Sequence, residues 1–344
     1  MSDGDRIRVL VVDDSAFARK VIREVLATSA SIEVVGIARD GLEALQQIAE
    51  LKPDVVTLDL VMPNLDGVAT LHALSELDQP TKVVVVSFSD EESELVVDAL
   101  QAGAIDFVRK PTALATGRLY GMGQQLVETV LAAAKAKPGA PPAPSLPIAF
   151  ETRALTHVDL VVIGTSTGGP QALTQLLPAF PADFPVPLLI ALHIPVEYTA
   201  PLAERLDRAS RITVREAGDA IVLRPGLALL ARGGMHLRVD RAAAQLVAKT
   251  TPKPASTPYM PSVDVLFESA AAACGARVLG VVLTGMGDDG LLGSRAIREA
   301  RGQVLTEAEA SCVIYGMPRS VDEAGLSSAQ VPLGSMVAEI VRRI

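Results

Sequence analysis

The chain has 344 residues, of which 49% are hydrophobic and 3% are aromatic, and it carries a formal net charge of −9. A chain of this length is expected to form roughly two domains, and an apolar composition with few aromatic residues is typical of α/β cores. The negative charge argues against a broad nucleic-acid-binding surface.

Cellular location is predicted from cysteine content and apolar runs. Cys274 and Cys312 are too few for a disulfide framework, so a reducing compartment is expected. The first six residues lead directly into an apolar strand and lack a signal-peptide core. No apolar run reaches the roughly 20 residues that a membrane-spanning helix needs. We therefore expect a cytoplasmic protein that does not insert into membranes. We also expect a monomer.

In the first 125 residues, predicted strands alternate with predicted helices. Apolar runs predict strands, and helical spacing predicts helices, at the following positions: strands at 7–12, 32–37, 54–58, 82–86 and 105–108, and helices at 16–28, 41–49 and 91–101. This alternation predicts a doubly wound parallel sheet. Ligands of such sheets bind at the carboxyl ends of the strands.

Polar residues occupy those carboxyl ends. Asp13 and Asp14 follow the first strand, Asp59 the third, Ser87 the fourth and Lys110 the fifth. Crowded carboxylates repel one another unless a cation lies between them, and oxygen ligands of this kind suit Mg²⁺. A lysine and a hydroxyl beside them would hold phosphoryl oxygens. The pattern predicts that Asp59 accepts a phosphoryl group, and the alternative is a set of solvated loop acids.

These positions and their flanking motifs resemble the receiver domain of response regulators. The matching segments cover the whole first domain and are Asp13-Asp14, residues 58–63 (LDLVMP), Asp66-Gly67, Ser87, Gly103-Ala104, Asp106-Phe107 and Lys110-Pro111. The resemblance implies a flavodoxin-like fold and phosphorylation of Asp59 by a histidine kinase.

The same resemblance implies how the phosphoryl site is built. Mg²⁺ would be held by Asp14, Asp59 and the carbonyl of Val61, with Asp13 acting through water. Ser87 and Lys110 would contact the phosphoryl group, so both are expected at this site.

A linker is predicted after the first domain. Residues 117–137 have helical spacing after the first few positions, and residues 138–147 are rich in Pro and Ala. Such a segment cannot bury a core and is expected to be an extended spacer. The predicted domains are residues 1–125 and 157–344, joined by a linker over 126–156.

The second domain also reads as α/β. Strands are predicted at 158–164, 187–192, 212–216, 226–231, 236–239, 245–249, 277–283 and 303–307, and helices from 170 and at 199–209, 263–274, 291–299 and 336–343. The strands near a Gly233-Gly234 turn predict a small antiparallel insert over 226–250. The remaining sheet is expected to be mainly parallel.

Residues 164–169 (GTSTGG) form a predicted turn between a buried strand and a helix. A serine between glycines at this place is the layout of a nucleophile elbow, because glycine lets the backbone turn sharply. The alternative is a phosphate or dinucleotide loop. That alternative is disfavoured because the turn lacks the P-loop lysine and a full G-x-G-x-x-G pattern. Ser166 is therefore the predicted nucleophile.

The base for Ser166 is chosen by elimination among four histidines. His72 lies on an expected helix in the first domain, His157 precedes its strand, and His236 lies on a hairpin. His193 alone follows a buried strand at its carboxyl end, so it is the predicted base. The acid that orients it is either Asp288 or Asp289, in the Gly-rich loop after the 277–283 strand.

Other catalytic classes fit less well. The chain order Ser, His, Asp differs from the order of α/β-hydrolases, which disfavours a general lipase or protease. Cys312 has no histidine placed for it and is expected to be a buried apolar residue.

The second domain resembles the catalytic domain of the CheB-type chemotaxis methylesterases. The matching segments are residues 163–170 (IGTSTGGP), 193–195 (HIP), 261–267 (PSVDVLF), 283–290 (LTGMGDDG) and 309–318. The resemblance assigns Ser166 as nucleophile, His193 as base and Asp289 as triad acid. It makes the backbone N–H of Met286 an oxyanion donor, with Thr165 in a supporting place.

The resemblance also implies the reaction. A phosphorylation-activated hydrolase would demethylate glutamate methyl esters on chemoreceptors, releasing methanol, and deamidate receptor glutamines, with no cofactor for the ester chemistry. The partners would be these receptors and a chemotaxis histidine kinase. The alternative is a non-catalytic phospho-receiver that docks on receptors.

Three segments depart from the family pattern. Leu192 stands where glutamine is common, residues 231–233 replace Ala-Pro-Gly, and Tyr259-Met260 replace basic or polar residues. These departures bear on substrate fit and loop shape, and they leave the expected reaction unchanged.

Overall fold

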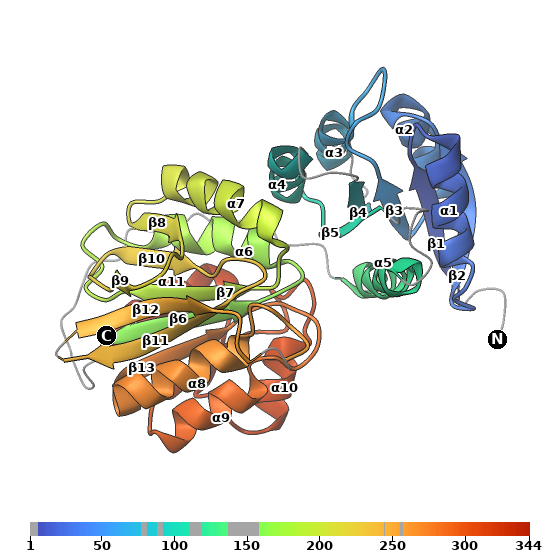
Figure 1. The fold of residues 1–344 in the computed structure, drawn as a ribbon. Helices are drawn as coiled ribbons and strands as arrows, with labels where there is room; N and C mark the ends of the chain where they lie inside the picture. The colour runs from blue at the N-terminus through green and yellow to red at the C-terminus, as the bar shows by residue number, and fades with distance from the viewer. Residues whose placement is uncertain are drawn as a thin grey trace. The chain divides into compact units, whose positions relative to one another are not determined.

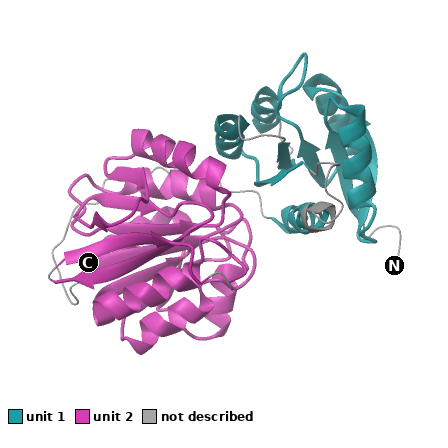
Figure 2. Cartoon of the chain, in the orientation of Figure 1, with its two compact units in different colours: residues 1–138 teal, residues 139–344 magenta. Residues whose placement is uncertain are grey.

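The chain forms two compact units, Met1–Pro138 and Gly139–Ile344, coloured separately in Figure 2. This computed structural model describes residues 6–76, 81–87, 92–110, 118–136, 158–243, 245–254 and 257–344. Each unit has its own sheet, so each is described by itself. His157 and residues 138–147, for which the sequence makes predictions, lie outside the described residues.

The first unit is built on a five-stranded parallel sheet with the order β2-β1-β3-β4-β5 (Figure 1). Its elements, in chain order, are β1 (Ile7–Val12), α1 (Ala16–Leu26), β2 (Ile32–Ala38), α2 (Gly41–Leu51), β3 (Val55–Leu58), α3 (Gly67–Ser75), β4 (Lys82–Ser87), α4 (Ser93–Gln101), β5 (Asp106–Arg109) and α5 (Arg118–Lys135). The predicted doubly wound sheet is confirmed.

Side-chain caps fix the starts of three helices in this unit. The side chains of Ser15, Asp40 and Asp66 accept hydrogen bonds from the first turns of α1, α2 and α3, where backbone N–H groups lack partners inside the helix. The sequence places His72 on a helix, and α3 confirms this, but its bounds were not predicted. Its apolar residues do not follow a clear helical stripe, and its start depends on the Asp66 cap.

Helix α5 packs on the first unit. Leu126, Val130 and Ala133 are fully buried, and the Lys82 ammonium donates to the carbonyl of Ala134. The predicted end of the first domain, residue 125, falls inside this continuous helix.

The second unit is built on a seven-stranded parallel sheet with the order β15-β14-β13-β6-β7-β10-β8. The strands of this sheet and the helices between them are β6 (Leu160–Thr165), α6 (Gly169–Leu176), β7 (Leu188–Leu192), α7 (Val196–Ala209), β8 (Thr213–Glu216), β10 (Leu227–Leu230), α8 (Val263–Cys274), β13 (Val278–Val282), α9 (Leu291–Glu299), β14 (Gln303–Glu307), α10 (Met317–Glu323), β15 (Ala329–Val331) and α11 (Leu333–Arg343).

The predicted small antiparallel insert is confirmed, but its predicted bounds, 226–250, are wrong for one strand. A separate three-stranded antiparallel sheet exists, with the order β11-β12-β9, formed by β9 (Ile221–Val222), β11 (His236–Ala242) and β12 (Gln245–Thr251). Strand β10 instead joins the parallel sheet between β7 and β8. Its Leu-Ala-Leu-Leu run is buried throughout, as parallel strands covered on both faces are.

Helices cover both faces of the seven-stranded sheet (Figure 1). Helices α8 and α9 pack together over β13, and α6 packs with α7 and α11 on the other side. A contiguous core that includes Leu160, Phe267 and Val304 lies under α8 and α9. Helix α10 and strand β15 were not predicted, because both are short and have little periodicity. The described part of the chain has no helix long and apolar enough to cross a bilayer.

The order of the strands determines which loops meet. Strands β13, β6 and β7 are adjacent and parallel, and Thr165 pairs with Leu192 while Gly164 pairs with Val282. The segments that follow these three strands therefore emerge side by side at one edge of the sheet.

Candidate functional sites

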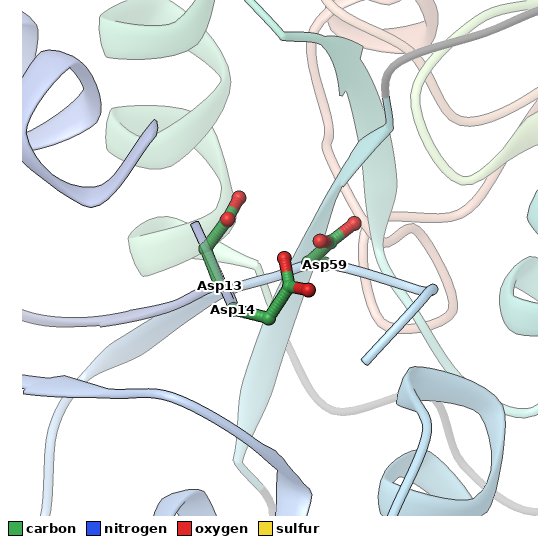
Figure 3. Close-up of side chains that lie close together, drawn as sticks. All are labelled: Asp13, Asp14 and Asp59. Atoms are coloured by element: carbon green, nitrogen blue, oxygen red, sulfur yellow. The ribbon is translucent and has the colours of Figure 1, made fainter. Parts of the chain in front are cut away.

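Three carboxylates meet at the carboxyl edge of the first sheet. Oxygen atoms of Asp13, Asp14 and Asp59 lie within 4.8 Å of one another, and Figure 3 shows the three side chains together. The Lys110 ammonium lies 2.7 Å from Asp59 Oδ2 and 2.9 Å from Asp13 Oδ2. The sequence predicts that these four residues meet.

Burial controls the charge of this cluster. It raises the pKa of Asp59 to about 6, against the lowering effect of the hydrogen bond and charge of Lys110. Burial by itself would lower the pKa of Lys110, but its bonds to Asp59 and Asp13 raise it overall. The Asp14 carboxylate is exposed, so this corner of the cluster is open to solvent. Oxygen ligands in this arrangement fit a hard divalent cation.

Ser87 lies at the end of β4, as predicted, and is buried. Its hydroxyl donates to the carboxylate of Glu92. Val61, whose carbonyl the resemblance assigns to the cation, is 52% exposed and follows Asp59 by two residues.

In the second unit, Ser166 stands between the end of β6 and the start of α6. Its N–H donates to the carbonyl of Thr284 at 3.1 Å, and its carbonyl accepts from Gly169 at 2.7 Å. Gly168 has φ of 78°, and a Cβ there would lie 2.7 Å from Val313. The turn therefore requires glycine at 168 for both conformation and space.

Gly164 and Thr165 belong to a strand, and not to the turn in which the sequence places them. Both lie in β6, and a Cβ on Gly164 would lie 2.2 Å from Val263 on α8. Gly164 thus allows α8 to pack closely. The Thr165 hydroxyl donates to Thr284 at 2.8 Å, so its side chain supports the turn that carries Ser166.

His193 follows β7 and has an acidic partner. Its Nε2 lies 2.7 Å from Asp289 Oδ2, and its backbone N–H donates to the carbonyl of Thr165 at 3.2 Å. The other ring nitrogen, Nδ1, is buried and has no hydrogen-bond partner among the described residues. A proton acceptor is therefore available next to the turn that carries Ser166.

Asp289 is held at the N-terminus of α8. Its carboxylate accepts from the N–H groups of Val263 (2.7 Å) and Asp264 (2.9 Å) and from the Ser262 hydroxyl (3.0 Å). Burial would raise the pKa of Asp289, but His193 and these N–H groups lower it overall. Asp288, the other acid that the sequence left open, is exposed.

Asp264 makes the reciprocal contact with α9. Its Oδ1 accepts from the N–H groups of Gly290 (2.9 Å) and Gly293 (2.7 Å), at the start of that helix. Burial raises the pKa of Asp264 to about 6, helped by the charge of Asp289 and opposed by these two N–H groups. Asp289 thus sits at the N-terminus of α8, the helix that carries Asp264, and Asp264 sits at the N-terminus of α9, the helix that follows Asp289.

The segment after β13 lies directly against the nucleophile turn. A Cβ on Gly285 would lie 2.8 Å from Ser166 Cβ, so the two backbones are in close contact. No described residue accepts a hydrogen bond from the N–H of Met286. The buried carboxylate of Glu307 accepts from the N–H of Thr284 at 2.8 Å and helps to fix this segment.

Tyr259 covers one face of the His193 ring. The two ring centroids are 4.2 Å apart and the planes differ by 6°. The sequence identified Tyr259 only as a departure from a family pattern, and it assigned no role to Ser262 or Asp264. A sequence pattern does exist for Ser262, because a serine directly before a predicted helix is a typical N-cap.

The remaining histidines and Cys312 lie elsewhere. His72 is in α3. His236 is buried in β11, where Nε2 faces the Pro254 carbonyl and Nδ1 accepts from the N–H of Ser262. Cys312 is buried, and burial and nearby carboxylates raise its thiol pKa strongly, which disfavours the reactive thiolate.

Two family models match the chain. The CheB methylesterase model matches residues 161–340, and the response regulator receiver model matches residues 9–119. These ranges contain the two sites described above.

Relatives match over the full length. A protein-glutamate methylesterase/protein-glutamine glutaminase of Myxococcus xanthus is 57% identical over 98% of both chains, and one of Geobacillus kaustophilus is 43% identical over 98% of this chain and 99% of that protein. Among solved structures, the methylesterase catalytic domain of Thermotoga maritima CheB is 33% identical, with a TM-score of 0.53, and covers 55% of this chain and 100% of that domain.

Proposed function

This chain belongs to the CheB methylesterase family and is an enzyme of the protein-glutamate methylesterase/protein-glutamine glutaminase type with a receiver domain, and from that premise we propose that it modifies chemoreceptors under phosphorylation control. It removes methyl groups from glutamate methyl esters and converts receptor glutamines to glutamates. The observation that carries the proposed chemistry is the His193–Asp289 pair. His193 Nδ1 has no hydrogen-bond partner among the described residues, and the His193 backbone is bonded to Thr165, the residue before Ser166.

The reaction has two steps. Ser166 Oγ attacks the carbonyl carbon of the ester, and His193 takes the serine proton at Nδ1, because Nε2 is engaged with Asp289. The bond to the methoxy oxygen breaks, and His193 returns the proton so that methanol leaves. A water molecule, deprotonated by His193, then attacks the acyl-enzyme, and Ser166 recovers its proton. Glutamine follows the same route and releases ammonia.

The N–H of Met286 is the proposed oxyanion donor. Support comes from the close contact between Gly285 and Ser166 and from the absence of an acceptor for this N–H among the described residues. A donor of this kind stabilises the transition state by about 3 kcal/mol. Thr165 contributes by fixing the turn through Thr284.

The first unit is the proposed phosphorylation switch. Asp59 accepts a phosphoryl group from a chemotaxis histidine kinase, and Lys110 and Ser87 contact the phosphoryl oxygens. Asp14, Asp59 and the carbonyl of Val61 would hold Mg²⁺, with Asp13 acting through water. The bound ion would supply positive charge that offsets the carboxylates and the phosphoryl oxygens.

We propose that phosphorylation controls the access of substrate to Ser166 and leaves the chemistry of Ser166 unchanged. In the unphosphorylated state the receiver limits the approach of substrate to Ser166, and phosphorylation of Asp59 releases that limit. The motivation is the pairing of a switch domain with a catalytic domain through a Pro-rich segment over 138–147.

Methanol release from methylated receptors tests the enzyme proposal. The wild type and Ser166→Ala are compared with and without a small-molecule phosphodonor. We expect release to fall to background in Ser166→Ala and to rise with the phosphodonor in the wild type. Equal rates for the two proteins would favour the alternative, a non-catalytic receiver that only docks on receptors.

A further inference from the structure

We propose that Tyr259 is a positioning residue for the reaction, holding the imidazole of His193 by its face and stabilising the imidazolium that forms in each step. This inference rests on the proposed function, because it assumes that His193 is the base for Ser166. Its experimental test is separable from the test of that function.

The imidazole of His193 is constrained at one edge and on one face. Asp289 fixes the Nε2 edge at 2.7 Å. A single hydrogen bond of this kind leaves the ring able to rotate about the line that joins the two atoms. The ring of Tyr259, parallel to within 6° at 4.2 Å, removes that freedom. With edge and face both fixed, the direction of the buried Nδ1 is determined.

Tyr259 is itself held by the surrounding loop. Its carbonyl accepts from the Thr257 hydroxyl at 3.0 Å, and the carbonyl of Met260 accepts from the N–H of Gly234 at 3.0 Å. Two residues further on, the N–H of Ser262 donates to the buried His236. The backbone on both sides of the tyrosine is thus anchored, so its ring is presented to His193 from a fixed position.

The hydroxyl end of Tyr259 reaches the loop that carries both Met286 and Asp289. A Cβ on Gly287 would lie 3.0 Å from Tyr259 Oη, so the phenol lies close over the Gly287 backbone. One side chain therefore contacts the proposed base and the segment between the proposed oxyanion donor and the triad acid. A glycine at 287, with φ of 80°, leaves room for that contact.

The stacked ring also discriminates between protonation states. The face of an aromatic ring attracts a cation more than a neutral ring, and His193 becomes cationic when it takes the serine proton. An interaction that strengthens in the transition state raises kcat, whereas one present equally in the bound ground state changes KM. A positioning role for Tyr259 therefore predicts an effect on kcat with little effect on KM.

Two full-length variants separate this role from packing. Tyr259→Phe keeps the aromatic face, and Tyr259→Leu keeps an apolar cover of His193 without it. For methanol release from methylated receptors, we expect Tyr259→Phe to stay within about threefold of the wild type. We expect Tyr259→Leu to lose roughly tenfold in kcat with KM nearly unchanged.

The pH profile gives a readout that packing does not move. Loss of the aromatic face disfavours the imidazolium, so the acid limb of kcat/KM in Tyr259→Leu should move to lower pH, by up to about one unit for a tenfold effect. Asp289, which is bonded to His193, and Asp264, whose N–H donates to Asp289, are unchanged in both variants. An unshifted limb together with wild-type kcat would overturn the assignment, and so would a change confined to KM.

Failure of this inference is distinguishable from failure of the proposed function. Ser166→Ala, measured in the same assay, reports on the enzyme proposal alone. If Ser166→Ala is inactive while Tyr259→Leu matches the wild type, only the role of Tyr259 is wrong. Thermal melting of each variant checks folding, and an active Tyr259→Phe shows that the loop tolerates substitution at this position.

Discussion

At the scale of single residues, the acid next to His193 gives the sharpest contrast. Asp289→Asn would remove the charge that favours the imidazolium and leave the ring free to adopt the wrong tautomer. We expect kcat to fall by roughly 10³ to 10⁴. Asp288→Asn is the matched control, because Asp288 is the preceding residue and is exposed. Methanol release within about twofold of the wild type is expected for the control, and a large loss there instead would transfer the role to Asp288.

Gly285 tests the contact between the oxyanion segment and the nucleophile. A methyl group at this position would meet Ser166 Cβ at 2.8 Å and Met317 Sδ at 2.4 Å, so Gly285→Ala must displace one of the two segments. We expect kcat to fall roughly ten- to a hundredfold, since small displacements of reacting groups have effects of this size. Gly334→Ala is the control, because a Cβ there meets nothing within 4 Å. Wild-type turnover in Gly285→Ala would rule out the close arrangement of Ser166 and Met286.

At the scale of elements, the two helix N-termini explain how Asp289 stays ionised while buried. The positive end of α8 and its free N–H groups stabilise the carboxylate, and Ser262 adds a third donor. Asp264 takes the same position on α9, but burial and the charge of Asp289 raise its pKa to about 6. The pair of helices therefore holds one acid that is charged and one that titrates under mildly acidic conditions.

The titration of Asp264 has a consequence for stability. Its pKa is about 6 in the folded state and 3.8 in the reference state, so between these values the folded protein binds more protons than the unfolded chain. Its contribution to stability is present below about pH 4 and is lost as pH rises to about 6, with a slope of up to about 1.4 kcal/mol per pH unit.

Asp264→Asn removes this titration but keeps an oxygen that can accept from Gly290 and Gly293. In denaturant unfolding at a series of pH values, we expect the stability difference, variant minus wild type, to grow from pH 4 to pH 6 and then to level off. A difference that is constant with pH would show that Asp264 does not titrate in this range.

The strand pattern explains why much of both sites was predictable from the sequence. Parallel strands buried on both faces are continuous apolar runs, so their carboxyl ends can be identified in the sequence, and Asp59, Ser166 and His193 all follow such runs. The same logic failed for β10, because an apolar run beside a Gly-Gly pair also fits a hairpin. Pairing partners distant in sequence decide between the two.

The residues that surround the His193 ring were not predictable in the same way. Tyr259 comes from an irregular loop, and its stacking on His193 depends on the placement of residues 66 positions apart in the chain. Ser262 and Asp264 act through a helix N-terminus that meets the loop of Asp289 only in the folded sheet. Such contacts have no local sequence pattern.

At the scale of the whole molecule, each unit has its own buried core. The core cluster under α8 and α9 consists entirely of residues between Leu160 and Leu326, so the catalytic unit does not need the receiver to bury its apolar residues. Regulation can therefore act on access to Ser166 without altering the packing behind the site. This separation is what makes a truncation experiment informative.

Removal of residues 1–147 tests whether the receiver inhibits. If the unphosphorylated receiver limits access to Ser166, the truncated protein should release methanol from methylated receptors faster than the unphosphorylated full chain. Its rate should also be independent of a phosphodonor and Mg²⁺, because Asp59 is gone. The full chain should approach the truncated rate when phosphorylated, and Asp59→Asn in the full chain should abolish that response. Turnover that is unchanged or lower after truncation would contradict inhibition and would indicate instead that the receiver activates the catalytic unit or recruits its substrate.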